Sequence, residues 1–286
     1  MRALLNTVVL IAALAAPASA QQSALSPDPL AYVSPSRTFT TTHISVDLDV
    51  DVVKQTVAGG VVNTVRALRD GTSDISFNCV DLVVESVEVD GKAAKYDYPV
   101  VSDQSTSWLA GTTQESADDR LVIHLAQPLA RNATAKVAIK YHGAPRIGLY
   151  WIQPEKGLPN SRWEVWSQGE GEDNRRWIPC NDYPNDKATF EGRFRVAKGY
   201  TAISNGALVE KKDAGEKTEF YYKLDQPQVS YLMMLAVAQY KIVEEKWRDV
   251  PVQYVVPPYA DEKTVLRCYG LTPDMIEFFS KEIGID

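Results

Sequence analysis

Histidine is scarce in this sequence, and its scarcity excludes several kinds of active site. The chain has only three, His43, His124 and His142. A serine or cysteine nucleophile needs a base beside it, and none of the three lies near a Gly-x-Ser-x-Gly turn. A zinc site on a helix needs two histidines one turn apart, as in His-Glu-x-x-His, and this spacing is absent. Each histidine is therefore expected on a strand face or at a strand end.

Phosphate-binding and nucleic-acid-binding signals are also missing. Gly169 and Gly171 alternate, but no third glycine and no helix follow them, so they do not form a dinucleotide fingerprint. The formal net charge is −7 and no basic block occurs, which argues against a nucleic-acid partner. Hydrophobic residues make up 45% and charged residues 23%, the composition of an ordinary globular protein.

Long hydrophobic runs occur only at the amino terminus. Met1-Arg2 is a short basic start, residues 3–16 are mostly apolar, and Ala18-Ser19-Ala20 is typical of a cleavage site. The apolar stretch is too short to be a stable membrane anchor, and the later run Leu232 to Ala238 has only strand length. We expect a signal peptide over residues 1–20, no membrane span, and an exported protein in a periplasm or outside the cell.

Cysteine is rare and odd in number. Cys79, Cys180 and Cys268 would stand in a compartment that permits disulfides, but their spacing resembles no metal site. The favoured interpretation is that they are small apolar residues, buried or unpaired. One disulfide with one free thiol is the alternative, and the pairing is left open.

Alternating strands dominate after a leader that we expect to be flexible over residues 21–37. Ile44, Val46, Leu48 and Val50 alternate with polar residues, as expected for a strand with one buried and one solvated face. The three aspartates of that strand fit its wet face better than a calcium loop, which needs turns and glycine. Further strands are expected at 57–68, 74–89, 120–125, 135–141, 189–196, 201–210, 219–224, 229–243 and 250–256. Many strands with no helix between them predict an all-β fold over residues 38–258, an antiparallel sandwich or large saddle-like sheet.

Helical signals appear only after Pro257-Pro258. Residues 261–269 read as a helix, and Thr272-Pro273-Asp274 offers an N-cap, an N1 proline and an early acid for a second helix through Ile283. Its apolar stripe, formed by Met275, Ile276, Phe279 and Ile283, has little in an all-β domain to pack against. We expect residues 259–286 to be the truncated start of a second, helical domain.

The most informative segment runs from Trp166 to Pro184. It gathers the acids Glu170, Glu172 and Asp173 with Arg175 and Arg176, and a segment this polar between strands is not expected to be mere core. Two of its carboxylates could serve glycoside hydrolysis, with Trp151, Trp163, Trp166 and Trp177 as a sugar platform. Alternatively, the acids pair with the arginines and the tryptophans pack between sheets. A third possibility is that one carboxylate binds a cationic ligand group, such as a substrate ammonium.

Within this segment the chain resembles the M1 family of zinc aminopeptidases, the aminopeptidase N relatives. The residues that carry the resemblance are Gln168-Gly169-Glu170, Arg175-Arg176, Pro179-Cys180, Asp182, Pro184 and Lys187-Ala188-Thr189-Phe190. The strand-rich region is similar to that family's amino-terminal saddle-like β domain. The end of the chain is similar to the linker and first helix of its thermolysin-like domain.

The resemblance implies a role for two residues. Glu170 would bind the free α-ammonium of a peptide substrate, and Gln168 would line the same subsite. The family's catalytic motifs, His-Glu-x-x-His with a downstream Glu and Gly-x-Met-Glu-Asn, are absent from this chain. We therefore expect the chain alone to have no catalytic residues, to bind no zinc and to cleave nothing, although the full-length family enzyme uses zinc. A free-standing exported module that binds peptide or glycan is the alternative.

Overall fold

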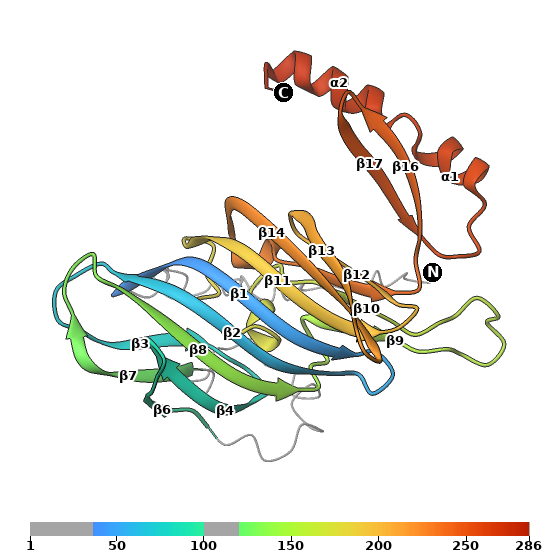
Figure 1. Cartoon of the computed structure of the whole chain (residues 1–286). Helices are drawn as coiled ribbons and strands as arrows, with labels where there is room; N and C mark the ends of the chain where they lie inside the picture. Colours follow the sequence, from blue (N-terminus) through green and yellow to red (C-terminus); the bar gives the residue numbers. More distant parts are fainter. Residues whose placement is uncertain (1–36, 100–119, 286) are drawn as a thin grey trace, which may run out of the picture. The chain divides into compact units, whose positions relative to one another are not determined.

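The computed structural model describes residues 37–99 and 120–285. The predicted signal peptide lies outside the described residues, as does all of the predicted leader except Arg37. Figure 1 shows the order of the elements along the chain.

An eight-stranded sheet forms the largest part of the fold (Figure 1). Its strand order is β13-β14-β11-β1-β2-β8-β4-β5. All neighbours are antiparallel except β1 and β11, which run parallel. The bounds are β1 Phe39–Asp51, β2 Thr56–Ala67, β4 Leu82–Val89, β5 Lys92–Ala93, β8 Thr134–Gly143, β11 Lys187–Ala197, β13 Ala207–Ala214 and β14 Lys217–Val229.

Two smaller sheets complete the strand-rich part. A four-stranded sheet has the order β12-β15-β10-β9, and a three-stranded sheet has the order β3-β7-β6. Their strands are β9 Leu149–Ile152, β10 Glu164–Ser167, β12 Thr201–Ser204 and β15 Leu235–Ala238, then β3 Thr72–Asn78, β6 Lys95–Asp97 and β7 Arg120–Leu129. In the described connections lie two short 3-10 helices, η4 Asn174–Arg176 and η5 Ser230–Leu232.

One hydrophobic core joins all three sheets. Strand β1 buries Ile44, Val46, Leu48 and Val50 and leaves the intervening polar residues at the surface, as the alternation predicts. The same core contains Phe77 from the three-stranded sheet, and further residues from the four-stranded sheet. The connection between β10 and β11 therefore begins and ends on sheets that share this core.

The last elements have a small core of their own. The hairpin of β16 Lys241–Trp247 and β17 Val250–Val256 is followed by α1 Glu262–Tyr269 and α2 Thr272–Ile283. Val243, Val252, Tyr254 and Val265 form the buried cluster, and Ile276 packs against it. The helix α2 thus contacts this cluster through only part of its apolar stripe, because Met275, Phe279 and Ile283 are exposed.

The all-β fold class is confirmed, and the two helices lie where the sequence predicted them, but several details differ. Predicted strand 74–89 is two strands of different sheets, because the chain turns at Asp81, which has φ +58°. Predicted strand 201–210 is broken at Gly206, with φ +86°. Predicted strand 229–243 contains η5, β15 and the start of β16. The N-cap of α2 is Leu271 and not Thr272. Among the described residues, no helix is long and apolar enough to cross a membrane.

Candidate functional site

The segment that carries the motif connects β10 to β11, and most of it is buried. Trp177, Ile178 and Cys180 are fully buried, and Asp182 is 1% exposed. The prediction that so polar a segment would not be core is therefore wrong for residues 174–182. It fails because the polar groups of this segment bond to one another and to neighbouring strands, so that burial leaves few of them unsatisfied.

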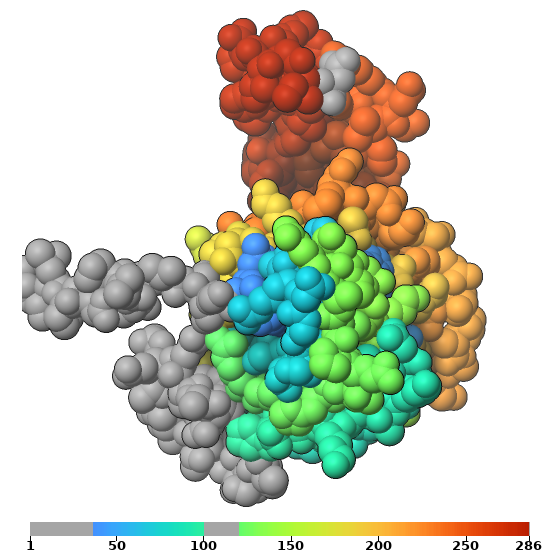
Figure 2. Space-filling view, turned by 90° about the vertical axis from the view of Figure 1, so that its left-hand side faces the viewer, coloured from blue at the N-terminus to red at the C-terminus, as the bar shows by residue number. Residues whose placement is uncertain are grey.

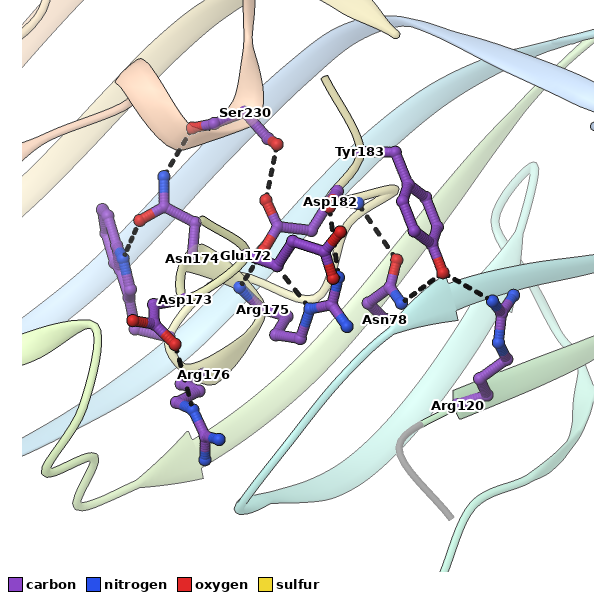
Figure 3. A network of polar contacts seen from close by, with 11 residues as sticks. Asn78, Arg120, Glu172, Asp173, Asn174, Arg175, Arg176, Asp182, Tyr183 and Ser230 are labelled. Carbon is purple, nitrogen blue, oxygen red and sulfur yellow. Dashed lines mark hydrogen bonds and ion pairs between the residues drawn. The ribbon is translucent and has the colours of Figure 1, made fainter. Parts of the chain in front are cut away.

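Asp182 is at the centre of this buried network (Figure 3). Its carboxylate accepts hydrogen bonds from Ser230 Oγ at 2.5 Å and from the Arg175 backbone N–H at 3.0 Å. The Arg175 Nε lies 3.4 Å from the same carboxylate. Burial raises the pKa of Asp182, and the bonds from Ser230 and Arg175 offset this only in part. The Asp182 backbone N–H donates to Asn78 Oδ1 at 3.1 Å, which ties the segment to β3.

Arg175 connects this buried carboxylate to the surface. Its side chain is 5% exposed, and its Nη2 donates to Glu172 Oε2 at 2.7 Å and to the Asp182 carbonyl at 3.1 Å. Its guanidinium lies 5.6 Å from the centre of the Tyr183 ring, and Arg120 donates to the Tyr183 hydroxyl at 2.7 Å. The alternative in which the acids pair with the arginines is confirmed for Glu172.

Asn174 fixes the turn that contains Gly169. Its Nδ2 donates to the carbonyls of Ser230 at 2.5 Å and Met233 at 3.0 Å, and its Oδ1 accepts from Trp177 Nε1 at 2.7 Å. A Cβ added at Gly169 would lie 2.4 Å from Asn174 Oδ1, so the glycine is required for this close approach. The side chain of Asn174 thus occupies the space that a residue at position 169 would need.

Gln168 and Glu170, the two predicted substrate-binding residues, flank this buried glycine and are both exposed. The Gln168 backbone N–H donates to the Gly148 carbonyl at 3.0 Å, which holds the end of β10. Within residues 37–99 and 120–285, neither side chain has a hydrogen-bond or ion-pair partner. Glu170 differs in this respect from Glu172 and from Asp173, whose carboxylate lies 3.5 Å from Arg176 Nε.

The tryptophans proposed for a sugar platform have different environments. Trp177 is fully buried, and Trp151 and Trp163 pack against the main core, as the packing alternative predicts. Trp166 is 40% exposed and stacks on Tyr150, with ring centres 4.9 Å apart. With Glu172 and Asp173 both held by arginines, the structure gives no support to a pair of free catalytic carboxylates.

The histidines lie on three strands and have separate partners. His43 Nδ1 is 2.7 Å from Thr189 Oγ1, and His142 Nδ1 is 2.7 Å from Glu85 Oε1. His124 lies between two aspartates of neighbouring strands. The predicted placement on strands is confirmed for all three. In the described part of the chain, no group of three His, Cys, Asp or Glu side chains could hold a metal ion, so these residues do not fit the family's zinc site.

Two cysteines are buried and one is exposed. Cys79 and Cys180 lie in the core, and Cys268 is exposed on α1. Burial raises the pKa of the Cys180 thiol, which disfavours the reactive thiolate. Cys180 also joins the segment to β3, because its backbone exchanges two hydrogen bonds with Asn78, at 2.8 and 3.2 Å.

Sequence reasoning missed the residues that hold the segment in place. Asn78, Asn174 and Ser230 come from three distant parts of the chain and meet around Asp182 and Gly169. Asp186 was also missed; it accepts bonds from Arg37, Thr40, the Thr41 backbone and Asn181. Single Asn and Ser residues follow no spacing rule, so only the composition of the segment, rich in Asp, Asn and Arg, signalled a network.

Comparisons with known proteins agree on one family. Residues 40–232 match the model of the peptidase M1 N-terminal domain. Leukotriene A-4 hydrolase of Xenopus laevis is 28% identical over 73% of this chain and 33% of its own length. Aminopeptidase B of Homo sapiens is 25% identical over 73% of this chain and 32% of its own length. The chain thus spans about a third of the length of these curated relatives.

Solved structures show the same fold. An M1 zinc metallopeptidase from Deinococcus radiodurans superimposes with a TM-score of 0.58 and 20% identity, over 76% of this chain and 46% of that chain. Yeast LTA4 hydrolase in complex with bestatin gives a TM-score of 0.59 and 21% identity, over 76% of this chain and 32% of that chain.

Proposed function

Because the chain belongs to the M1 peptidase family, matching its N-terminal domain, we propose that it is the recognition part of an exported zinc aminopeptidase. In this proposal Glu170 binds the α-ammonium of a peptide substrate and Gln168 lines the same subsite. The zinc-binding catalytic part is not among these residues. The enzyme would remove amino-terminal residues from peptides.

One observation carries the proposal: among the described residues Glu170 is exposed and unpartnered, on a turn where Gly169 packs against Asn174 and where Glu172 and Asp173 are bound to arginines. Within residues 37–99 and 120–285 no cation neutralises it, whereas the adjacent acids are held by arginines. A carboxylate in this state can form charge-assisted hydrogen bonds to an ammonium. A peptide with a blocked amino end would leave this carboxylate unpaired, so the contact would also select for free amino termini.

Related structures support this choice of ligand. M1 zinc metallopeptidases of the same fold were solved with a Tyr-Ser-Ala substrate and with L-arginine, both of which carry a free α-ammonium. In such enzymes zinc supplies an activated water for attack on the peptide bond. In the described residues no group of three His, Cys, Asp or Glu side chains could hold a metal ion, and the role proposed for them is to bind and orient the amino end.

The domain arrangement and export belong to the same proposal. Residues 1–20 are the signal peptide and 21–37 the leader, residues 38–258 the β domain, and residues 259–286 the start of the catalytic domain. The exposed apolar side chains of α2, including Met275, Phe279 and Ile283, support a following domain that would cover them.

The decisive experiment compares two polypeptides from the source genome. The 286-residue chain, purified after removal of residues 1–20 and supplied with zinc, should release no amino acid from aminoacyl substrates. The polypeptide encoded by the frame continued beyond Asp286 should be active. In that longer protein, Glu170→Ala should lower kcat/KM about 10- to 150-fold, the loss of one hydrogen bond to a charged group. Glu172→Ala, on the same turn but bound to Arg175, should have little effect.

Two outcomes would contradict the proposal. Hydrolysis by the pure 286-residue chain would show that the catalytic part is not needed. A stop codon after Asp286 with no zinc-binding motif encoded nearby would favour a noncatalytic protein.

The second candidate is an exported module that binds peptide or glycan. It is favoured by the stacked pair of Tyr150 and Trp166, because an exposed aromatic face can bind a sugar ring or an apolar side chain. Binding of oligosaccharides or peptides to the 286-residue chain, abolished by Trp166→Ala, would support this candidate over the enzyme.

A further inference from the structure

His124 lies on the middle strand of the three-stranded sheet. It lies on β7, where it is paired with Asp74 of β3 on one side and with Lys95 of β6 on the other. Asp97, two residues after Lys95, projects from the same face of β6 because side chains alternate along a strand. The imidazole therefore lies between carboxylates of both neighbouring strands.

Both ring nitrogens of His124 are at hydrogen-bond distance from a carboxylate. Nδ1 is 2.7 Å from Asp74 Oδ1, and Nε2 is 2.8 Å from Asp97 Oδ2. An ionised carboxylate only accepts hydrogen bonds, and a neutral imidazole has one N–H. Both contacts can be hydrogen bonds only when the ring carries two protons. We propose that doubly protonated His124 fastens the edge strand β6 to β7 and β3, and that the loss of one proton as the pH rises releases β6.

The Asp97 contact is the one that breaks. Asp74 has a second donor, Ser73 Oγ at 2.7 Å, which holds its carboxylate in place. Asp97 has an 81% exposed side chain, against 49% for Asp74, and belongs to a strand of three residues. A neutral ring keeps its remaining proton toward Asp74, and its free lone pair then repels the Asp97 carboxylate. The Asp97 carboxylate is therefore accessible to solvent, and Figure 2 shows the teal segment that includes β6 at the surface.

The two carboxylates bound to His124 favour the protonated ring. The hydrogen bonds that the ring donates to Asp97 and Asp74 raise the pKa of His124. Asp90, Lys92 and Lys95 line a pocket together with His124. The other charged group near this face is Arg120 on β7, which is bound to Tyr183 and Ser76. A histidine with a raised pKa contributes its stability below its ordinary pKa and loses it as the pH rises through the raised value. The hydrogen bonds from Ser73 and His124 lower the pKa of Asp74, so this carboxylate remains charged in mildly acidic solution.

NMR titration of the histidines in the full chain tests directly whether His124 holds β6. The chain has three histidines, so the Cε1–H signal of His124 can be assigned with His124→Gln. Its titration midpoint should lie above the ordinary value of 6.5, and Asp97→Asn and Asp74→Asn should each lower it. The backbone amides of Lys95, Tyr96 and Asp97 should shift with the same midpoint and lose hydrogen-exchange protection above it. Glu85→Gln is the matched control: it removes the partner of His142 and should leave the His124 titration unchanged.

Two results would overturn the proposal. One is a His124 midpoint that Asp97→Asn and Asp74→Asn both leave unchanged, which would mean that neither carboxylate holds the ring. The other is a wild-type chain in which the amides of β6 do not respond while His124 titrates, which would mean that the ring does not hold this strand.

Discussion

Replacing Asp182 by alanine should severely destabilise the protein. The change removes the acceptor for Ser230 Oγ and for the Arg175 backbone N–H, at 2.5 and 3.0 Å, and leaves the nearly buried Arg175 guanidinium without one of its two carboxylate partners. Removal of one member of a buried ion pair costs about 3–5 kcal/mol. For a protein of this size, we expect a fall in Tm of about 6–20 °C.

Two further variants separate the physical causes. Asp182→Asn keeps one acceptor oxygen and removes the charge, so it should cost less than Asp182→Ala. The charge itself is unfavourable at this site, since burial raises the pKa of Asp182. Glu172→Ala removes the other carboxylate partner of Arg175, but that carboxylate is 42% exposed, so the loss should be no more than about 1 kcal/mol.

Denaturation in urea, followed by tryptophan fluorescence, measures all three variants. Trp177 is fully buried beside this network and reports its loss. If Glu172→Ala destabilises as much as Asp182→Ala, the network is not organised around the buried acid. If Asp182→Ala costs less than about 1 kcal/mol, the buried pair of Asp182 and Arg175 gives little more stability than a buried methyl group in its place.

The remaining predictions concern the turn beside Glu170. Gly169→Ala should cost about 1–3 kcal/mol, because the new methyl group would overlap the fixed side chain of Asn174. Gly171→Ala, at φ +62° with open space around it, should cost only about 1–2 kcal/mol and leave the turn in place. In the active, longer protein Gly169→Ala should therefore weaken substrate binding more than Gly171→Ala does, and equal effects of the two variants would refute this distinction. Trp177→Phe removes the donor to Asn174 Oδ1 and part of a fully buried ring, so we expect a loss of about 2–4 kcal/mol in denaturation measurements. A Trp177→Phe protein as stable as the wild type would show that Asn174 does not need this bond.

Local pattern predicted the elements better than their connections. Alternation located β1 and most of the other strands, and the acid and proline after Leu271 located α2. The parallel pairing of β1 and β11 was not predicted, since parallel strands need a long connection and many partners were possible. Pattern also could not show that the chain turns between β3 and β4, where Asp81 adopts a positive φ.

For the site, the sequence identified the right segment and misjudged its surroundings. Order and spacing of Gln168, Glu170, Arg175 and Asp182 sufficed to indicate the M1 family, which the comparison over residues 40–232 confirms. Which acids have partners depended on distance in space. Glu172 is paired with Arg175, and Asp182 accepts a hydrogen bond from Ser230, 48 residues away, whereas Glu170 is bound to neither Arg175 nor Ser230. Composition and spacing record the kinds of groups present, whereas burial and hydrogen bonding depend on which strands the core brings together. The tertiary structure alone therefore distinguished the charges that hold the turn from the one left exposed at its tip.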